Sequence, residues 1–214
     1  MRLHFVTILA VYCIVTASCS SLIKKPTKAY IKANPPTPIK IDGLLATPRY
    51  STHIYALLNT GPDTLGISVN STYVYYPFGL IKSKPKPNLG VLRNFGITNK
   101  IIQTAIGNID IQILKHRSSK LIFFFNTVNG DKHADILKGE VYDTDVKFIN
   151  SIIIGMSVDD FYKCFFDHFP LELENRYKFF ELESADEIKH IYSFENNKLK
   201  VVKFSSNRAF VAAY

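Results

Sequence analysis

The chain has 214 residues, of which 47% are hydrophobic and 21% are charged, and its formal net charge is +8. These values are typical of a folded globular protein and exclude an intrinsically disordered one. The basic residues are spread along the chain and accompany no recognised nucleic-acid-binding motif, so we expect no nucleic-acid partner. The length suffices for one large domain or two small ones.

Residues 1–18 have the layout of a cleaved signal peptide. Arg2 supplies a positive start, Phe5–Val15 form an apolar run, and small residues follow this run. The run is much shorter than the roughly 20 residues that a helix needs to cross a bilayer. The segment therefore predicts a leader that is removed from the mature protein.

The end of this leader resembles the lipobox of bacterial lipoproteins. Its residues are Thr16-Ala17-Ser18-Cys19, and in that family the cysteine becomes the first mature residue and carries acyl chains such as palmitate. The resemblance implies lipidation at Cys19 and an anchored protein of the bacterial cell envelope, at the outer membrane rather than the inner one, facing the periplasm or the cell surface. The family prefers Leu where this chain has Thr16, and the alternative is an ordinary secretory signal that leaves a soluble protein.

The cysteines do not form a disulfide framework. Cys13 would leave with the leader and Cys19 would carry lipid, which leaves Cys164 as the free thiol of the mature chain. Because three phenylalanines surround Cys164 in the sequence, we expect a small buried hydrophobic residue rather than a nucleophile.

Residues 19–42 are predicted to form an extended Lys- and Pro-rich tether. Four prolines oppose helix formation and keep such a segment extended. Residues 20–42 hold five lysines against Asp42 alone, and each lysine next to a lipid anchor can gain about 1 kcal/mol from anionic headgroups. The alternative is a solvated linker whose lysines only keep it soluble.

Residues 43–147 are predicted to be rich in strands. The apolar runs at His53–Leu58 and Tyr73–Tyr76 predict strands, and turn-forming residues at 59–63 follow the first run. A helix is expected around Asn99–Ala105. Three further strands, starting at Ile109, Lys120 and Ala134, predict an antiparallel meander; the first alternates isoleucine with polar residues.

Residues 148–214 are predicted to form a helix followed by three antiparallel strands. Ser157 and Asp160 form a capping box, and the helix is expected to bury a phenylalanine face and to end at Pro170. The strands are expected at 177–183, 188–194 and 198–204. A two-residue turn at Asn196-Asn197 should place Phe194 opposite Leu199 and Tyr192 opposite Val201.

The order of Gly155-Met156-Ser157, amphipathic helix and final hairpin resembles the small outer-membrane lipoprotein assembly-factor family and its relatives with the β-lactamase-inhibitor-protein-like fold. The resemblance covers residues 148–205. It implies an α+β fold, an antiparallel β-sheet packed against one or two helices. It also implies a non-catalytic module that binds other proteins. In the family a Gly-x-Pro follows the helix, whereas this chain has His168-Phe169-Pro170.

The sequence shows no catalytic or metal-binding spacing. It has no G-x-S-x-G, H-E-x-x-H or C-x-x-C motif, and the histidines that follow Cys19 stand far apart. We therefore expect no catalytic residues, no metal and no cofactor. The expected partners are the membrane, through the lipid, and another envelope protein. The alternatives are a secreted or surface-anchored hydrolytic enzyme, whose residues converge only in the fold, and a soluble enzyme inhibitor.

One segment points to a partner surface. In Leu121–Phe125 both faces of the expected strand are apolar, so either both faces of the sheet are covered or one is open to a partner. In the second case Phe124 and Ile122 would bind the partner, with Tyr73 and Tyr75 as neighbours. The alternative is that these side chains belong to the core.

Overall fold

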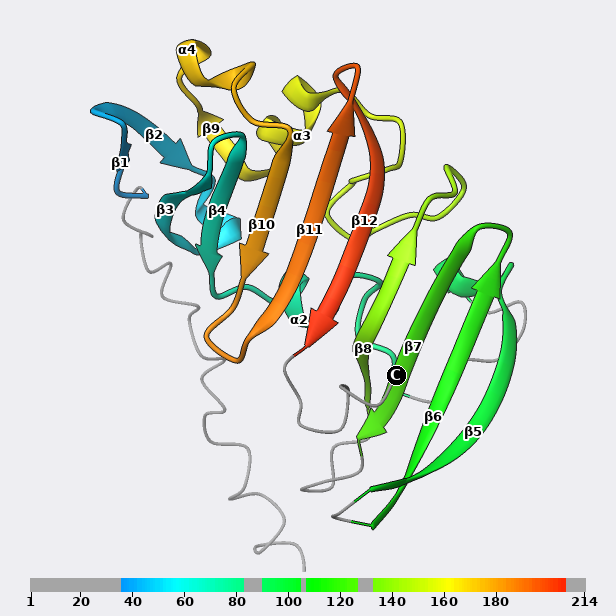
Figure 1. Ribbon diagram of the computed structural model, residues 1–214. Coiled ribbons are helices and arrows are strands. Elements are labelled where there is room, and N and C mark those ends of the chain that lie inside the picture. Colours follow the sequence, from blue (N-terminus) through cyan, green and yellow to red (C-terminus); the bar gives the residue numbers. More distant parts are fainter. Residues whose placement is uncertain (1–35, 83–89, 105–106, 127–132, 207–214) are drawn as a thin grey trace, which may run out of the picture. The chain divides into compact units, whose positions relative to one another are not determined.

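Strands dominate the part of the chain that the structure describes. The computed structural model describes residues 36–82, 90–104, 107–126 and 133–206 (Figure 1). Among them only one helix, α3 (Val158–Phe165), is longer than four residues. The single-turn helices are α2 (Thr72–Tyr75) and α4 (Leu171–Glu174), with 3-10 turns η1 (Tyr50–Thr52) and η2 (Gly90–Leu92). The α+β prediction is therefore wrong, and the fold is β-rich.

A nine-stranded sheet forms the body of the fold, in the order β3-β4-β10-β11-β12-β8-β7-β6-β5. The neighbours β4 and β10 are parallel, and the other neighbours are antiparallel. The strand bounds are β3 (Ile54–Gly61), β4 (Thr64–Val69), β5 (Gly96–Thr104), β6 (Gly107–His116), β7 (Ser119–Asn126), β8 (His133–Val141), β10 (Phe179–Glu183), β11 (Ile188–Glu195) and β12 (Lys198–Ser206).

The last three strands of the chain fill the middle of this sheet. They lie between β4 and β8, so the predicted regions 43–147 and 148–214 share one sheet (Figure 1). The centre of the sheet therefore consists of strands that are far apart in the sequence.

A second, three-stranded sheet has the order β1-β2-β9, with β1 (Ile39–Ile41), β2 (Leu44–Pro48) and β9 (Phe166–His168). Strand β1 falls inside the predicted tether of residues 19–42, so the end of that segment belongs to the folded body. The turn from β1 to β2 holds Asp42 and Gly43 at positive φ, as a tight hairpin turn requires. Asp42 also forms an ion pair with Arg176, which fixes this hairpin to the loop after α4.

The start of α3 is as predicted, and its end is not. Ser157 Oγ accepts a hydrogen bond from the Asp160 backbone N–H at 3.1 Å, which confirms the N-cap half of the predicted capping box; the Asp160 carboxylate accepts from the Ser157 hydroxyl at 2.7 Å. The helix ends at Phe165 instead of running to Pro170, because the next residues pair with β2 as strand β9. Backbone pairing with β2 therefore replaces the last turn that the phenylalanine spacing suggested.

Two other predicted elements are wrong in type. Tyr73–Tyr76 was expected as a strand, but α2 covers most of it and buries Tyr73 and Val74 against the core. The expected helix around Asn99–Ala105 is the edge strand β5, which pairs with β6 from Gly96 opposite Lys115 to Thr104 opposite Gly107. In both segments tertiary contacts override a weak local preference.

The meander and the final hairpin are confirmed as strands β6–β8 and β10–β12. Asn196 and Asn197 take φ values of 50° and 57°, and Phe194 lies opposite Leu199. Tyr192 lies opposite Val202 rather than Val201, because the register shifts between Ser193 and Phe194. The predicted pairing is therefore right at the turn and off by one residue beyond the bulge.

Apolar side chains pack on both faces of the sheet. The main core centres on Phe161 of α3, whose ring centroid lies 4.9 Å from those of Phe180 and Tyr192. A second cluster lies on the opposite face of strands β5 to β8 and comprises Ile102, Ile109, Ile111, Ile122 and Leu137. The doubly apolar strand at Leu121–Phe125 thus contributes to both clusters.

Candidate functional site

The predicted partner-binding residues do not gather on one exposed face. Ile122 and Tyr73 are 4% and 6% exposed and belong to different clusters. Phe124 is half-buried against the second cluster, and Tyr75 is half-buried against the main core, with its hydroxyl donating to Asp186 at 2.8 Å. Ile122 and Tyr73 are thus core residues, and a binding role for Phe124 and Tyr75 stays a prediction. Cys19 lies outside the described residues.

Cys164 is partly buried on α3. Its Sγ donates to the Asp160 carbonyl at 3.3 Å, and burial raises the pKa of the thiol although Arg49 opposes this shift. The thiol is therefore protonated at neutral pH and poorly suited to nucleophilic attack.

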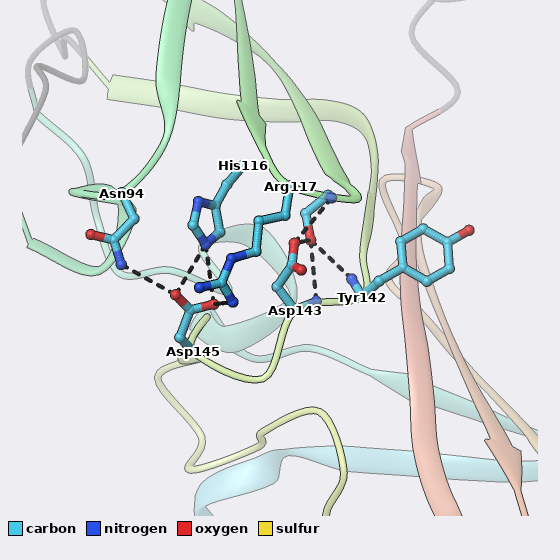
Figure 2. Close-up of polar contacts among 7 residues, drawn as sticks. Asn94, His116, Arg117, Tyr142, Asp143 and Asp145 are labelled. Atoms are coloured by element: carbon cyan, nitrogen blue, oxygen red, sulfur yellow. Dashed lines mark hydrogen bonds and ion pairs between the residues drawn. The ribbon is translucent and has the colours of Figure 1, made fainter.

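A polar cluster joins the β6–β7 turn to the loop after β8, and we call it the turn cluster (Figure 2). His116 Nε2 lies 3.0 Å from Asp145 Oδ2, and Arg117 and Asn94 reach the same carboxylate. Burial would raise the pKa of Asp145, but the hydrogen bond and charge of His116, with Arg117, lower it overall. Asp145 is therefore a carboxylate held by donors from three sides.

Ser119 forms the second half of the turn cluster. Its Oγ donates to Asp143 Oδ2 at 2.6 Å and accepts the backbone N–H groups of Tyr142 and Asp143 at 3.0 and 3.3 Å. In Figure 2 the ring of Tyr142 points away from this cluster, so only its backbone takes part. Ser119 is 1% exposed and its hydroxyl is fully bonded. A serine, a histidine and two aspartates are thus close together, but their hydrogen bonds hold the β6–β7 turn to the loop after β8. The Ser119 hydroxyl is therefore not available as a nucleophile.

A second histidine lies in the core, in a chain of hydrogen bonds that we call the His190 network. His190 Nε2 lies 3.0 Å from the Val74 carbonyl, and Nδ1 lies 3.2 Å from the Tyr192 hydroxyl. Because a carbonyl can only accept, Nε2 carries the hydrogen and Nδ1 accepts from Tyr192, which in turn accepts from the Tyr73 hydroxyl.

The His190 network is uncharged. His190 and Tyr192 are fully buried, and burial lowers the pKa of His190 to about 3 although the bond to Val74 opposes this shift. Burial likewise raises the pKa of Tyr73 and Tyr192. The sequence does not predict this network, because more than 100 residues separate its two halves, Tyr73-Val74 and His190–Tyr192.

The surface where β2, β9, α3 and α4 meet is hollowed, and we call it the acidic groove. Two adjoining hollows of about 430 and 460 Å³ share His168 and Leu171 in their linings. The floor of the first is aromatic, because the rings of Tyr162 and Phe169 stack at 4.2 Å with Phe166 beside them. These three rings are only 3–5% exposed, so they close the bottom of the hollow and leave most of the exposed apolar surface of the groove to Leu171 and Leu45.

The rim of the acidic groove combines exposed leucines with carboxylates. Leu171 and Leu45 are 74% and 56% exposed and line the second hollow. Within the described part of the chain, no ion pair reaches the carboxylates that line the two hollows, except one between Asp167 and Arg49 at 3.3 Å; they are Asp159, Asp167, Glu172 and Glu174. The rim is therefore anionic around an apolar floor.

The described residues hold no group of three or more His, Cys, Asp or Glu side chains that could bind a metal ion. None of the helices in the described ranges is long and apolar enough to cross a bilayer. Comparisons with protein-family models, with curated proteins and with solved structures find no match to this chain. The resemblances to bacterial lipoproteins and to the assembly-factor family thus stay predictions.

Proposed function

We propose that this chain is a non-catalytic protein-binding module of the bacterial envelope, anchored through lipid on Cys19, whose partner binds in the acidic groove. The observation that carries the proposal is the exposure of Leu171 and Leu45 beside an aromatic floor. Two exposed leucines that line the same hollow form a local apolar patch, and such patches mark interaction sites more often than single exposed apolar residues do.

The charge of the rim indicates the chemistry of the partner. Asp159, Glu172 and Glu174 would repel an anionic segment and attract a cationic one. The cation within the groove, Lys163, lies 3.2 Å from Asp160 and is therefore already engaged. The expected ligand is a segment of another envelope protein that presents apolar side chains between lysines or arginines.

The lipid anchor would favour such binding without adding contacts. A tethered module meets membrane-associated partners at a raised local concentration. Modest affinity in the acidic groove would then suffice, because the anchor raises the effective concentration of the partner.

The binding step is tested with a helix-forming peptide of leucine and lysine, whose affinity for the full chain is measured by calorimetry. The double variant Leu45→Ser, Leu171→Ser should weaken binding by about tenfold or more, because exposed anchors dominate such interfaces. Ile101→Ser is the matched control, since Ile101 is 70% exposed on β5 at the far edge of the sheet from the groove.

Reversing the charge of the rim with Glu172→Lys and Glu174→Lys should weaken binding further and reduce its salt dependence. Equal affinity in the leucine double variant and in Ile101→Ser would contradict the proposal. A leucine and glutamate peptide that binds as well as the lysine one would also contradict it.

Anchoring is tested by mass spectrometry of the mature amino terminus. A first residue Cys19 that carries acyl chains supports the proposal. A mature chain that begins downstream of residue 19, or one without fatty acid, would leave the acidic groove as a binding site and refute the membrane anchor.

A further inference from the structure

Another hollow, which we call the basic pocket, lies where the described part of the chain begins. It encloses about 610 Å³ between residues 36–40 and residues 48–55. Strand β1 and the segment before it form one wall, and η1 with the start of β3 forms the other. The covalent path from Cys19 therefore reaches the folded body at this pocket.

The basic pocket has the opposite charge to the acidic groove. Its lining holds Lys40, Arg49 and His53 and no aspartate or glutamate. Arg49 is partly neutralised by Asp167, whereas Lys40 is exposed and has no ion pair within the described residues. The pocket therefore presents net positive charge to the solvent.

Two tyrosines stand at the mouth of the basic pocket. Tyr50 and Tyr55 are each 57% exposed, and within the described ranges neither hydroxyl has a hydrogen-bond partner. Tyrosine combines an apolar ring with a polar tip, and it is enriched at the boundary between lipid and water. Aromatic rings beside Lys40, whose charge is not neutralised by an ion pair within the described residues, are a combination that suits anionic lipid headgroups.

We propose that the basic pocket binds the headgroups of an anionic phospholipid bilayer and so orients the folded body on the membrane. The proposal rests on the proposed function only for the supply of a membrane. The 16 residues between Cys19 and Pro36 reach roughly 50 Å when extended at about 3.1 Å per residue, which lets the pocket touch the surface that holds the anchor.

The test uses the absence of tryptophan from the sequence. Tyr50→Trp in the full chain gives a single indole at the mouth of the basic pocket. Tyr142→Trp is the matched control, because Tyr142 is 40% exposed and follows β8, which four strands separate from β3. Each variant is mixed with vesicles of phosphatidylcholine alone or with one quarter phosphatidylglycerol, and the fluorescence maximum and its quenching by brominated lipid are measured.

We expect a blue shift and quenching for the indole at position 50 with phosphatidylglycerol vesicles, and neither for position 142. Adding Lys40→Glu to Tyr50→Trp should raise the lipid concentration at half-maximal shift about tenfold. The control Lys115→Glu reverses an exposed lysine on β6 and should leave that concentration unchanged.

An unshifted indole at position 50 in vesicle-bound protein would overturn the proposal, as would equal responses at positions 50 and 142. A blue shift produced equally by glycerol phosphate in solution would assign the pocket to a soluble anion and overturn the membrane source. Because the readout is local to position 50, it is independent of whether Cys19 carries lipid, which the mass spectrum decides separately.

Discussion

The turn cluster and the His190 network each contain a histidine bonded to oxygen, yet the two histidines have different roles. His116 Nε2 lies 3.0 Å from the Asp145 carboxylate, whose side chain is 35% exposed. His190 lies in the core between a carbonyl and a hydroxyl, and protonation there would bury a charge without a counterion. The comparison teaches that the surroundings, and not the residue type, decide the role of a histidine in this fold: His116 holds a carboxylate of a surface loop, and burial keeps His190 neutral in the core.

The largest expected effect is the pH dependence of stability from His190. Its pKa is about 3 in the folded chain and about 6.5 when unfolded, so the unfolded state binds more protons between these values. The free energy of unfolding should therefore fall as the pH drops from 6.5 towards 3, by on the order of 4 kcal/mol from this group.

His190→Gln removes the titrating ring and can keep the bond to Val74, so urea unfolding of this variant should show a flatter pH profile than the parent chain. Many carboxylates also titrate in this range, and the difference between the two profiles isolates His190. Parallel profiles would mean that the histidine is not neutral in the core.

A smaller effect is expected from Ser119→Ala in the turn cluster. The change removes the hydroxyl partner of two backbone N–H groups, whereas Asp143 Oδ2 keeps its hydrogen bond from the Ser119 backbone N–H at 3.1 Å. Unsatisfied groups of this kind destabilise by about 1–3 kcal/mol, measured as a shift of the urea midpoint at unchanged slope. Ser205→Ala, at an exposed position of β12, serves as the control and should change the midpoint little.

The smallest effect is expected from Asp145→Asn, which keeps the shape of the side chain and removes its charge. The Asp145 side chain is 35% exposed, and pairs of this kind contribute at most about 1 kcal/mol. The pKa of Asp145 is lowered in the fold, so its contribution is present above the unfolded pKa and is lost as the pH falls. Urea unfolding of Asp145→Asn, of His116→Gln and of the double variant should show non-additive destabilisation; additive effects would mean that the two side chains do not interact.

Local signals were read correctly where the sequence itself contains the contact. The capping box at Ser157 and Asp160, the alternation in β6 and the Asn196-Asn197 turn each involve neighbours in the chain. The α+β prediction was wrong because it rested on the one clear helix. The pairing of strands that are far apart in the sequence, which makes the fold β-rich, has no local signal. The true end of α3 depends on pairing with β2, more than 100 residues earlier in the chain.

The sites were less predictable than the strands for the same reason. The acidic groove combines residues 43–45 with residues 159–174, and the His190 network joins α2 to β11. Neither grouping has a spacing motif. His116 and Asp145 are 29 residues apart in the sequence, and only the course of the loop after β8 brings the His116 Nε2 to 3.0 Å from the Asp145 carboxylate.

The position of β10, β11 and β12 between β4 and β8 has a consequence for how the protein is made. During synthesis, β4 lacks its neighbour β10 and β8 lacks its neighbour β12 until almost the whole chain has been made. Such late, long-range pairing slows folding and leaves strand edges with unpaired backbone N–H and C=O groups in the meantime. A nascent chain of this order stays unfolded for longer than one built from successive hairpins, because the centre of its sheet forms last.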